Sequence, residues 1–217
     1  MYVSTSRVAR ELGLSRRRVT ELVRTGGLEA TNVAGRWVID AAEVAKYRVL
    51  NRVNGRPWDS DLSWEMITAI SGLGGEISTR AELRLLNTDA LTFVSQIHRL
   101  ITVEWFQARN IDEQSARVFL TADSAISLID HDVLGTSSAM HLYTDIADIP
   151  RAFDAVSYVQ GNLAVYRWRD GKQRVVGNTP SILIAIDAAR STDARVRAAG
   201  IEFVEQELRL WQEIHSQ

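Results

Sequence analysis

The chain has 217 residues and is 46% hydrophobic, which is enough for a small domain and a larger one, each with an apolar core. It contains no cysteine, which excludes disulfide bonds and thiolate metal sites and favours a reducing, cytoplasmic location. No apolar run approaches the roughly 18 residues of a membrane-spanning helix, and no apolar segment follows Arg7 and Arg10. We therefore expect neither a membrane protein nor a secretion signal.

The formal net charge of −2 hides a difference between two parts of the chain. Residues 1–56 contain eleven Lys and Arg against five Asp and Glu, a difference of +6. Residues 57–217 contain 14 basic and 22 acidic residues, a difference of −8. A basic segment of this kind is typical of a surface that binds a polyanion, so we expect nucleic acid at residues 1–56 and not at the remainder.

Two short helices are expected first. Hydroxyl side chains at residues 4–6 can cap a helix whose apolar residues recur at helical spacing, and Gly13 suits its end. Ser15 can cap a second helix over residues 16–25, which has one apolar face. Two helices joined by a short turn that contains glycine form a helix-turn-helix unit.

A hairpin and a third helix are expected next. Strands over residues 28–33 and 36–39 would be joined around Ala34-Gly35, with Trp37 packing the hairpin onto the helices. Asp40 can cap a helix over residues 41–50.

These residues resemble the excisionase and MerR-type winged helix-turn-helix. The resemblance covers VSTSRVARELGLSRRRVTELVRTGGLEATNVAGRWVIDAAEVAKY, about one fifth of the chain. It is carried by the order helix, Gly-Leu-Ser turn, basic helix, GGLEA, hairpin with GRW, and Asp-capped helix. The resemblance implies that the helix over residues 16–25 enters the major groove of double-stranded DNA, while the hairpin, or wing, touches the adjacent backbone or minor groove.

The arginines at the start of this second helix oppose the helix dipole, so we expect a phosphate or a base edge to compensate them. Successive helical residues turn by about 100°, so Arg17 and one neighbour are expected to contact DNA while the third arginine stays in solvent. The candidate DNA-binding residues are Ser15, Arg16, Arg17, Arg18, Thr20, Arg24, Asn32 and Arg36.

Pro57 marks the expected domain boundary, because proline breaks a helix that continues from residues 41–50. Residues 57–217 are expected to form a mixed α+β domain for dimerisation or partner binding, so the fold class is α+β, with a small N-terminal winged helix-turn-helix and a larger mixed α+β domain. The elements expected in this domain, in chain order, are helices over residues 59–71, 79–86 and 89–100, a strand over 101–108, a helix over 121–130, a short strand over 140–143, a strand region over 158–176, and helices over 180–189 and after Asp193.

Three details of this domain can be checked. Thr79 or Ser78, with Glu82, suggests a capping box. Asp170-Gly171 predicts a hairpin turn followed by a strand at Val175-Val176. The last helix carries a stripe expected to be mostly buried: Val196, Gly200, Phe203, Val204, Glu207, Leu208, Trp211 and Ile214.

This domain also resembles a known group. GRPWDSDLSWEMITAISGL and NLAVYRW…NTPSILIAIDAARSTDARVRAAGIEFVEQEL are similar to actinobacterial helix-turn-helix regulators paired with nucleotidyltransferase-like toxins. The resemblance implies an antitoxin that also represses its own operon. The chain departs from the common pattern before the central helices, where Glu76 and Glu82 replace a basic stretch.

No catalytic pattern is present in the sequence, so we expect no enzyme, cofactor or metal. The four histidines form no zinc-binding pair, and Ser137-Ser138 lacks the nucleophile-elbow motif. The cluster at residues 130–132, Asp-His-Asp, is expected to be a helix end that runs into a solvated loop. Three functions stay open: a DNA-binding regulator that works as a homodimer, an antitoxin whose acidic part binds a basic toxin, and a ligand-sensing regulator.

Overall fold

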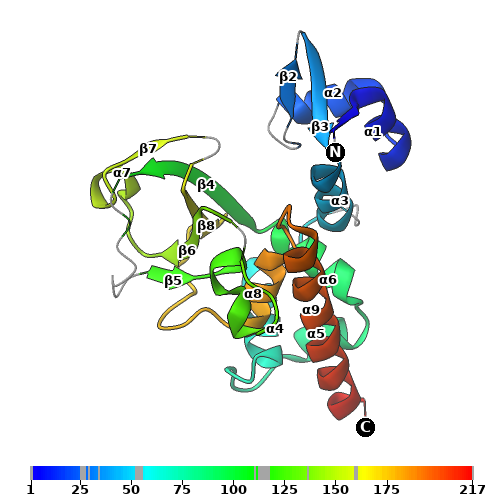
Figure 1. Ribbon diagram of the computed structural model, residues 1–217. Coiled ribbons are helices and arrows are strands. Elements are labelled where there is room, and N and C mark those ends of the chain that lie inside the picture. The colour runs from blue at the N-terminus through cyan, green and yellow to red at the C-terminus, as the bar shows by residue number, and fades with distance from the viewer. Residues whose placement is uncertain are drawn as a thin grey trace.

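The computed structural model describes residues 2–24, 28, 30–33, 35–51, 56–109, 111, 118–135, 137–158 and 161–216. Helices and strands combine in a mixed α+β fold, so the prediction of the α+β class is confirmed. A small N-terminal lobe lies at one end of the molecule, and the C-terminal helix runs to the opposite end (Figure 1). Among the described helices, none has the length and apolar content that crossing a bilayer requires.

The described residues of the N-terminal lobe form three short strands and three helices. The elements are β1 (Tyr2–Ser4), α1 (Thr5–Leu12), α2 (Arg16–Arg24), β2 (Thr31–Val33), β3 (Arg36–Asp40) and α3 (Ala41–Leu50). Strand β1 was not predicted; it pairs antiparallel with β3, which gives the order β1-β3-β2. The observed strand β2 begins at Thr31 and is shorter than the strand predicted over residues 28–33. Leu28 belongs to the core of the lobe instead.

The core of this lobe is made by one face of each helix and by β1 and β3. Its buried residues include Val8, Val19, Leu22 and Ile39. Trp37, which we expected to pack the hairpin onto the helices, is half-buried and is not among the described residues that pack against this core.

Helix α3 connects the two lobes. On one side, Arg48 donates a hydrogen bond to the backbone oxygen of Glu11 at the end of α1 (3.0 Å). On the other side, Leu50 is buried in the larger core, and the Ser95 hydroxyl donates to its backbone oxygen (2.9 Å). The same helix therefore contacts both cores. Residues 52–55, just before the expected boundary, lie outside the described residues.

The larger lobe has a helical part with α4 (Ser60–Ile70), α5 (Thr79–Leu86), α6 (Ala90–His98), α8 (Ser181–Ala188) and α9 (Ala194–His215). Helix α8 is the central one, since every residue from Ile182 to Ala188 is buried. Helix α9 crosses it at Gly200, where an added Cβ would lie 2.5 Å from the backbone oxygen of Ala185. The two helices therefore touch through their backbones. Pro180, expected at the first helical position, is the residue that precedes α8.

The prediction that Glu82 completes a capping box at the start of α5 is wrong. The N-cap is Ser78, whose hydroxyl accepts a hydrogen bond from the backbone N–H of Ala81 (3.3 Å). Glu82 is one residue too far along the helix to return the bond. Glu65 of α4 accepts the backbone N–H of Ser78 instead, so the cap is completed from a neighbouring helix.

The remainder of the lobe is built on a five-stranded sheet with the order β5-β6-β8-β4-β7. The pair of β6 and β8 is parallel and the other pairs are antiparallel. The predicted helix over residues 121–130 is a 3₁₀ helix, Ala122–Leu128. The strands, together with the one short helix beside them, are β4 (Ile101–Ala108), β5 (Val118–Leu120), β6 (Met140–Thr144), α7 (Ile149–Ala152), β7 (Ala155–Ser157) and β8 (Leu163–Trp168).

The predicted hairpin at Asp170-Gly171 is wrong. Gly171 does turn the chain, with φ +74°, but β8 pairs with β4 and β6, and residues 172–176 form no strand. Arg174 contacts both Asp170 and Asp61, at 2.6 Å each, and its guanidinium lies over the ring of Trp168. These contacts hold the segment against α4 instead of the sheet.

Candidate nucleic-acid interface

Local hydrogen bonds fix the first two helices and the turn between them. The Ser4 hydroxyl caps α1 by accepting the backbone N–H of Arg7 (3.3 Å), and Gly13 ends that helix in the left-handed conformation (φ +65°). The Ser15 hydroxyl accepts the backbone N–H of Arg18 (3.2 Å) in the first turn of α2. The predicted caps at residues 4, 13 and 15 are confirmed.

One side of α2 is buried and the other is basic. Arg17 and Arg24 are seven residues apart, so they lie within about 20° of each other around the helix. Thr20 lies between them, and its hydroxyl donates to the backbone oxygen of Arg16 (3.0 Å). The side chains of Arg16, Arg17 and Arg24 are exposed. We call this surface the α2 face; it consists of Arg16, Arg17, Thr20 and Arg24.

Acidic side chains of this lobe pair with bases outside the α2 face. The pairs are Arg7 and Arg48 with Glu11, Lys46 with Glu43, and Arg18 with Glu21. Arg18 lies about 100° around α2 from Arg17 and is already paired, with its guanidinium 3.0 Å from the Glu21 carboxylate. Among the residues that the structure describes, no ion pair is formed by Arg16, Arg17, Arg24 or Arg36.

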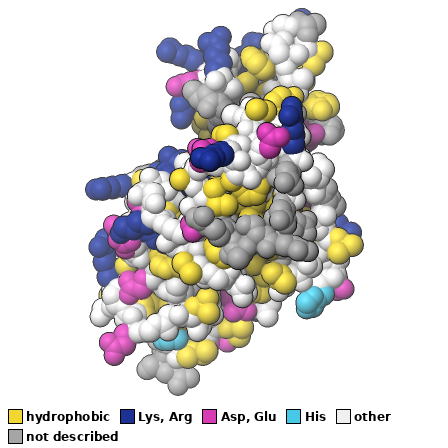
Figure 2. Space-filling model, turned by 90° about the vertical axis from the view of Figure 1, so that its left-hand side faces the viewer, with side chains coloured by type: hydrophobic (Ala, Val, Ile, Leu, Met, Phe, Trp, Pro, Cys, Tyr) yellow, Lys and Arg dark blue, Asp and Glu magenta, His cyan; other side chains and the backbone are white. Residues whose placement is uncertain are grey.

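The unpaired arginines on α2 lie in an unfavourable position for an isolated helix. The first turn of α2 contains no acidic residue, and Arg16 and Arg17 add positive charge to the positive end of the helix dipole. A bound anion would compensate both the charges and the free backbone N–H groups. Lys and Arg side chains gather over this lobe at the top of Figure 2.

The two hairpin candidates lie on opposite faces of the strand pair. Asn32 pairs with Trp37, and Val33 pairs with Arg36, so the side chains of Asn32 and Arg36 alternate. The Asn32 side-chain oxygen accepts the backbone N–H of Gly35 (2.9 Å), which leaves its amide NH₂ for an external acceptor. Arg36 is exposed. Four of the eight candidates thus lie on the α2 face, and Ser15 caps α2. Arg18 is paired with Glu21, and Asn32 and Arg36 lie on the hairpin.

Two features were missed in the sequence. One is the pairing of Arg18 with Glu21: both Arg17 and Arg18 have a spacing to Glu21 that favours an ion pair on a helix, and only the structure shows that Arg18 makes it. The other is a shallow depression of about 290 Å³ on α1, lined by Arg7, Arg10 and Glu11, which are not among the candidate residues. Of these, Arg10 forms no ion pair with any described residue.

A second group of polar side chains is buried in the larger lobe. The two ring nitrogens of His141 contact the Tyr166 hydroxyl (3.0 Å, Nδ1) and the Ser137 hydroxyl (3.1 Å, Nε2). The Asp123 carboxylate lies 3.8 Å from the same Nε2 that contacts Ser137. A nucleophilic triad needs the acid and the serine on different ring nitrogens, so these three side chains do not form one.

Burial determines the titration of this group. Burial, and after it the charge of Arg190, lowers the pKa of His141 to about 4. Burial raises the pKa of Asp187 to about 6, although Thr121 (2.7 Å) and Tyr143 (2.9 Å) both donate to its carboxylate.

His141 should therefore make folding sensitive to acid. Its pKa falls from 6.5 in the unfolded chain to about 4 in the folded protein, so the unfolded chain binds more protons between these values. Stability from His141 is complete above pH 6.5 and is lost as the pH falls toward 4. We expect His141→Gln to reduce the loss of unfolding free energy between pH 7.5 and pH 5 by about 2 kcal/mol, as measured by urea denaturation.

The direction in which the pH dependence of stability changes tests this prediction. Asp187, with its raised pKa, acts in the opposite direction, so only the difference between the variant and the original chain isolates His141. An identical pH dependence in both proteins would show that His141 is not held neutral by burial.

No metal centre is apparent in the described part of the chain, where no group of three or more His, Asp or Glu side chains is arranged to hold an ion. The Asp130 carboxylate accepts the backbone N–H of Asp132 (3.0 Å) in a turn after the 3₁₀ helix, as expected for a helix end that runs into a loop.

Comparisons of this chain with protein-family models, curated proteins and solved structures found no match. The function proposed below therefore rests on the residues and geometry of the chain itself.

Proposed function

We propose that the protein is a sequence-specific DNA-binding regulator of transcription, with residues 1–56 acting as a winged helix-turn-helix. The α2 face carries the proposal: exposed arginines that form no ion pair with any described residue lie on one side of a helix whose other side is buried. The order of two helices, a three-residue turn and a hairpin supports it.

Helix α2 would enter the major groove with the α2 face toward the bases. The rise of about 1.5 Å per residue separates Arg17 from Arg24 by about 10 Å, which is about three base steps along one strand. Arginine can donate two hydrogen bonds to guanine or to a phosphate. Arg17, nearer the start of α2, would read a base or bind a phosphate, and Arg24 would contact DNA farther along the groove.

The hairpin would contribute contacts on either side of its tip. Arg36 would pair with a phosphate of the adjacent backbone, and the Asn32 amide would donate to a phosphate or to a minor-groove acceptor. A single helix reads few base pairs, so the regulator would bind as a homodimer on two half-sites, in the cytoplasm, with its own promoter as the first candidate operator.

The proposal is tested by DNA binding of the full chain to the region upstream of its own coding sequence and to a randomised duplex library. We expect affinity for the selected sequence to exceed that for random DNA by about a thousandfold or more. The logarithm of the binding constant should fall linearly with the logarithm of the salt concentration, with a slope of about −0.9 for each phosphate neutralised. Equal affinity for selected and random DNA would reject a sequence-specific regulator.

A further inference from the structure

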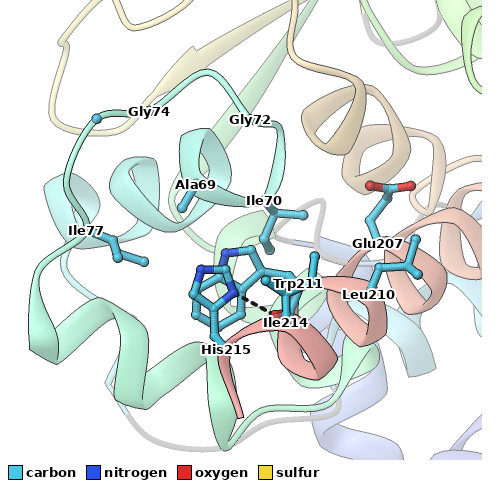
Figure 3. A pocket seen from close by; sticks show the side chains of 11 residues that line it. Ala69, Ile70, Gly72, Gly74, Ile77, Glu207, Leu210, Trp211, Ile214 and His215 are labelled. Atoms are coloured by element: carbon cyan, nitrogen blue, oxygen red, sulfur yellow. Dashed lines mark hydrogen bonds between the residues drawn. The ribbon is translucent and has the colours of Figure 1, made fainter. Parts of the chain in front are cut away.

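A groove opens on the larger lobe between α9 and the connection from α4 to α5 (Figure 3). Its volume is about 430 Å³. Ala69, Ile70 and Ile77 line one side, and Trp211 and Ile214 of α9 line the other. We call this surface the α9 groove. Its walls are mostly apolar, although it opens to solvent.

Apolar side chains beside the groove are uncovered. Ile214 is 71% exposed, Leu210 43% and Leu73 65%. The prediction that Ile214 lies on the buried stripe of α9 is therefore wrong; nothing in the described part of the chain covers it. Neighbouring exposed apolar side chains of this size are typical of a surface that another molecule covers.

The aromatic floor of the groove is held in place. The ring of His215 stacks on Trp211 with centroids 4.0 Å apart and an angle of 11° between the planes. The His215 Nδ1–H donates to the backbone oxygen of Trp211 (2.8 Å), as Figure 3 shows. A partner that binds here would meet a ring that is already ordered, which reduces the entropy lost on binding.

The margin of the groove is acidic. Glu207 lines it, and Glu76 lies between the lining residues Gly75 and Ile77. No Lys or Arg lines the groove among the residues described. From residue 202 to its end, α9 has four Glu and one Arg: Glu202, Glu205, Glu207, Glu213 and Arg209. A partner with basic side chains around an apolar one would match this surface.

A second copy of the chain is the poorer occupant. It would bring the same acidic helix against this one. The groove also lies near the C-terminal end of α9, far from the N-terminal lobe (Figure 1). Two copies joined there would hold their N-terminal lobes at opposite ends of the particle, whereas neighbouring DNA half-sites are about 34 Å apart.

We infer that the α9 groove is the docking surface for a partner protein that inserts an apolar side chain flanked by Lys or Arg. The apolar side chain packs between Trp211 and Ile77 and covers Leu210 and Ile214. The basic side chains meet Glu207 and Glu76. Since the groove is distant from the α2 face, the partner and DNA can be bound at the same time.

The test uses a phage-displayed library of random peptides, selected on the full chain and counter-selected on a Leu210→Ser/Ile214→Ser double variant. Both side chains are exposed, so the double variant should keep its fold and its DNA affinity. We expect the selected peptides to share an apolar residue flanked by Lys or Arg. In fluorescence anisotropy with synthetic copies, the double variant should bind at least about tenfold more weakly, and Glu207→Gln should reduce the salt dependence of binding.

A control is Leu128→Ser/Leu134→Ser, which removes two exposed leucines (69% and 76%) outside the groove and should leave peptide binding unchanged. The inference is overturned if no peptide depends on Leu210 and Ile214, or if the dependent peptides lack basic residues. It is also overturned if sedimentation shows a dimer of the original chain that the double variant abolishes, because a second copy then occupies the groove. DNA binding is measured separately, so this result and that of the proposed function are independent.

Discussion

Arg17→Ala should weaken binding of the selected DNA by about 1–3 kcal/mol, measured by gel-shift or anisotropy titration at a fixed salt concentration. Arg17 lies opposite the buried side of α2 and makes no ion pair within the described part of the chain, so its donors are free for DNA. If it reads a base, the loss will be larger for the selected sequence than for random DNA. If it binds a phosphate, both will weaken alike and the magnitude of the salt slope will fall by about 1.

Arg18→Ala is the matched control. Arg18 belongs to the same helix and has the same charge, but its guanidinium is paired with the Glu21 carboxylate. Its removal should cost much less than removal of Arg17. Equal effects of the two substitutions would mean that net charge, and not the α2 face, determines affinity.

Gly200 should be the glycine whose replacement most disturbs the helical part of the larger lobe. An added Cβ would lie 2.5 Å from the backbone oxygen of Ala185 and 2.9 Å from the backbone nitrogen of Ala189. Because both atoms belong to the backbone near the end of α8, the two helices must separate. We expect Gly200→Ala to lower the unfolding free energy by about 1–3 kcal/mol despite a helix-propensity gain of about 1 kcal/mol, and Gly200→Val to lower it further.

Urea denaturation of the full chain measures this effect, and Gly75→Ala is its control. Gly75 has no neighbour within 4 Å of an added Cβ and no left-handed backbone, so its replacement should leave stability almost unchanged. If Gly200→Ala were as stable as Gly75→Ala, the close crossing of α8 and α9 would be disproved.

Helices of the larger lobe were predictable where their signals are local. Asp59, Asp89 and Asp193 each accept backbone N–H groups at the start of a helix, and each was visible as an acidic residue before an apolar periodic segment. The caps around Gly13 and Ser15 are local in the same way. These features depend on residues within one turn of each other, so one sequence is enough to find them.

The errors come from contacts between distant residues. Strands β1, β5 and β7 have three residues each, too few to show an alternating pattern, and only their partners define them. The false hairpin after β8 arose because Arg174 bonds to Asp61, more than a hundred residues away. Within the candidate site, composition identified the basic helix, but the assignment of each arginine to a face required the ion pairs.

The position of α3 limits how the N-terminal lobe can be separated from the rest. A fragment that ends at residue 56 would keep α3 but lose the larger core around Leu50 and the Ser95 hydroxyl bonded to its backbone oxygen. The Leu50 side chain would be exposed to solvent, and its backbone oxygen would exchange the Ser95 hydroxyl for water. The N-terminal lobe therefore cannot be transferred to another protein unless the fusion provides a new surface that covers the end of α3. Exchanging only the side chains of the α2 face leaves this junction unchanged.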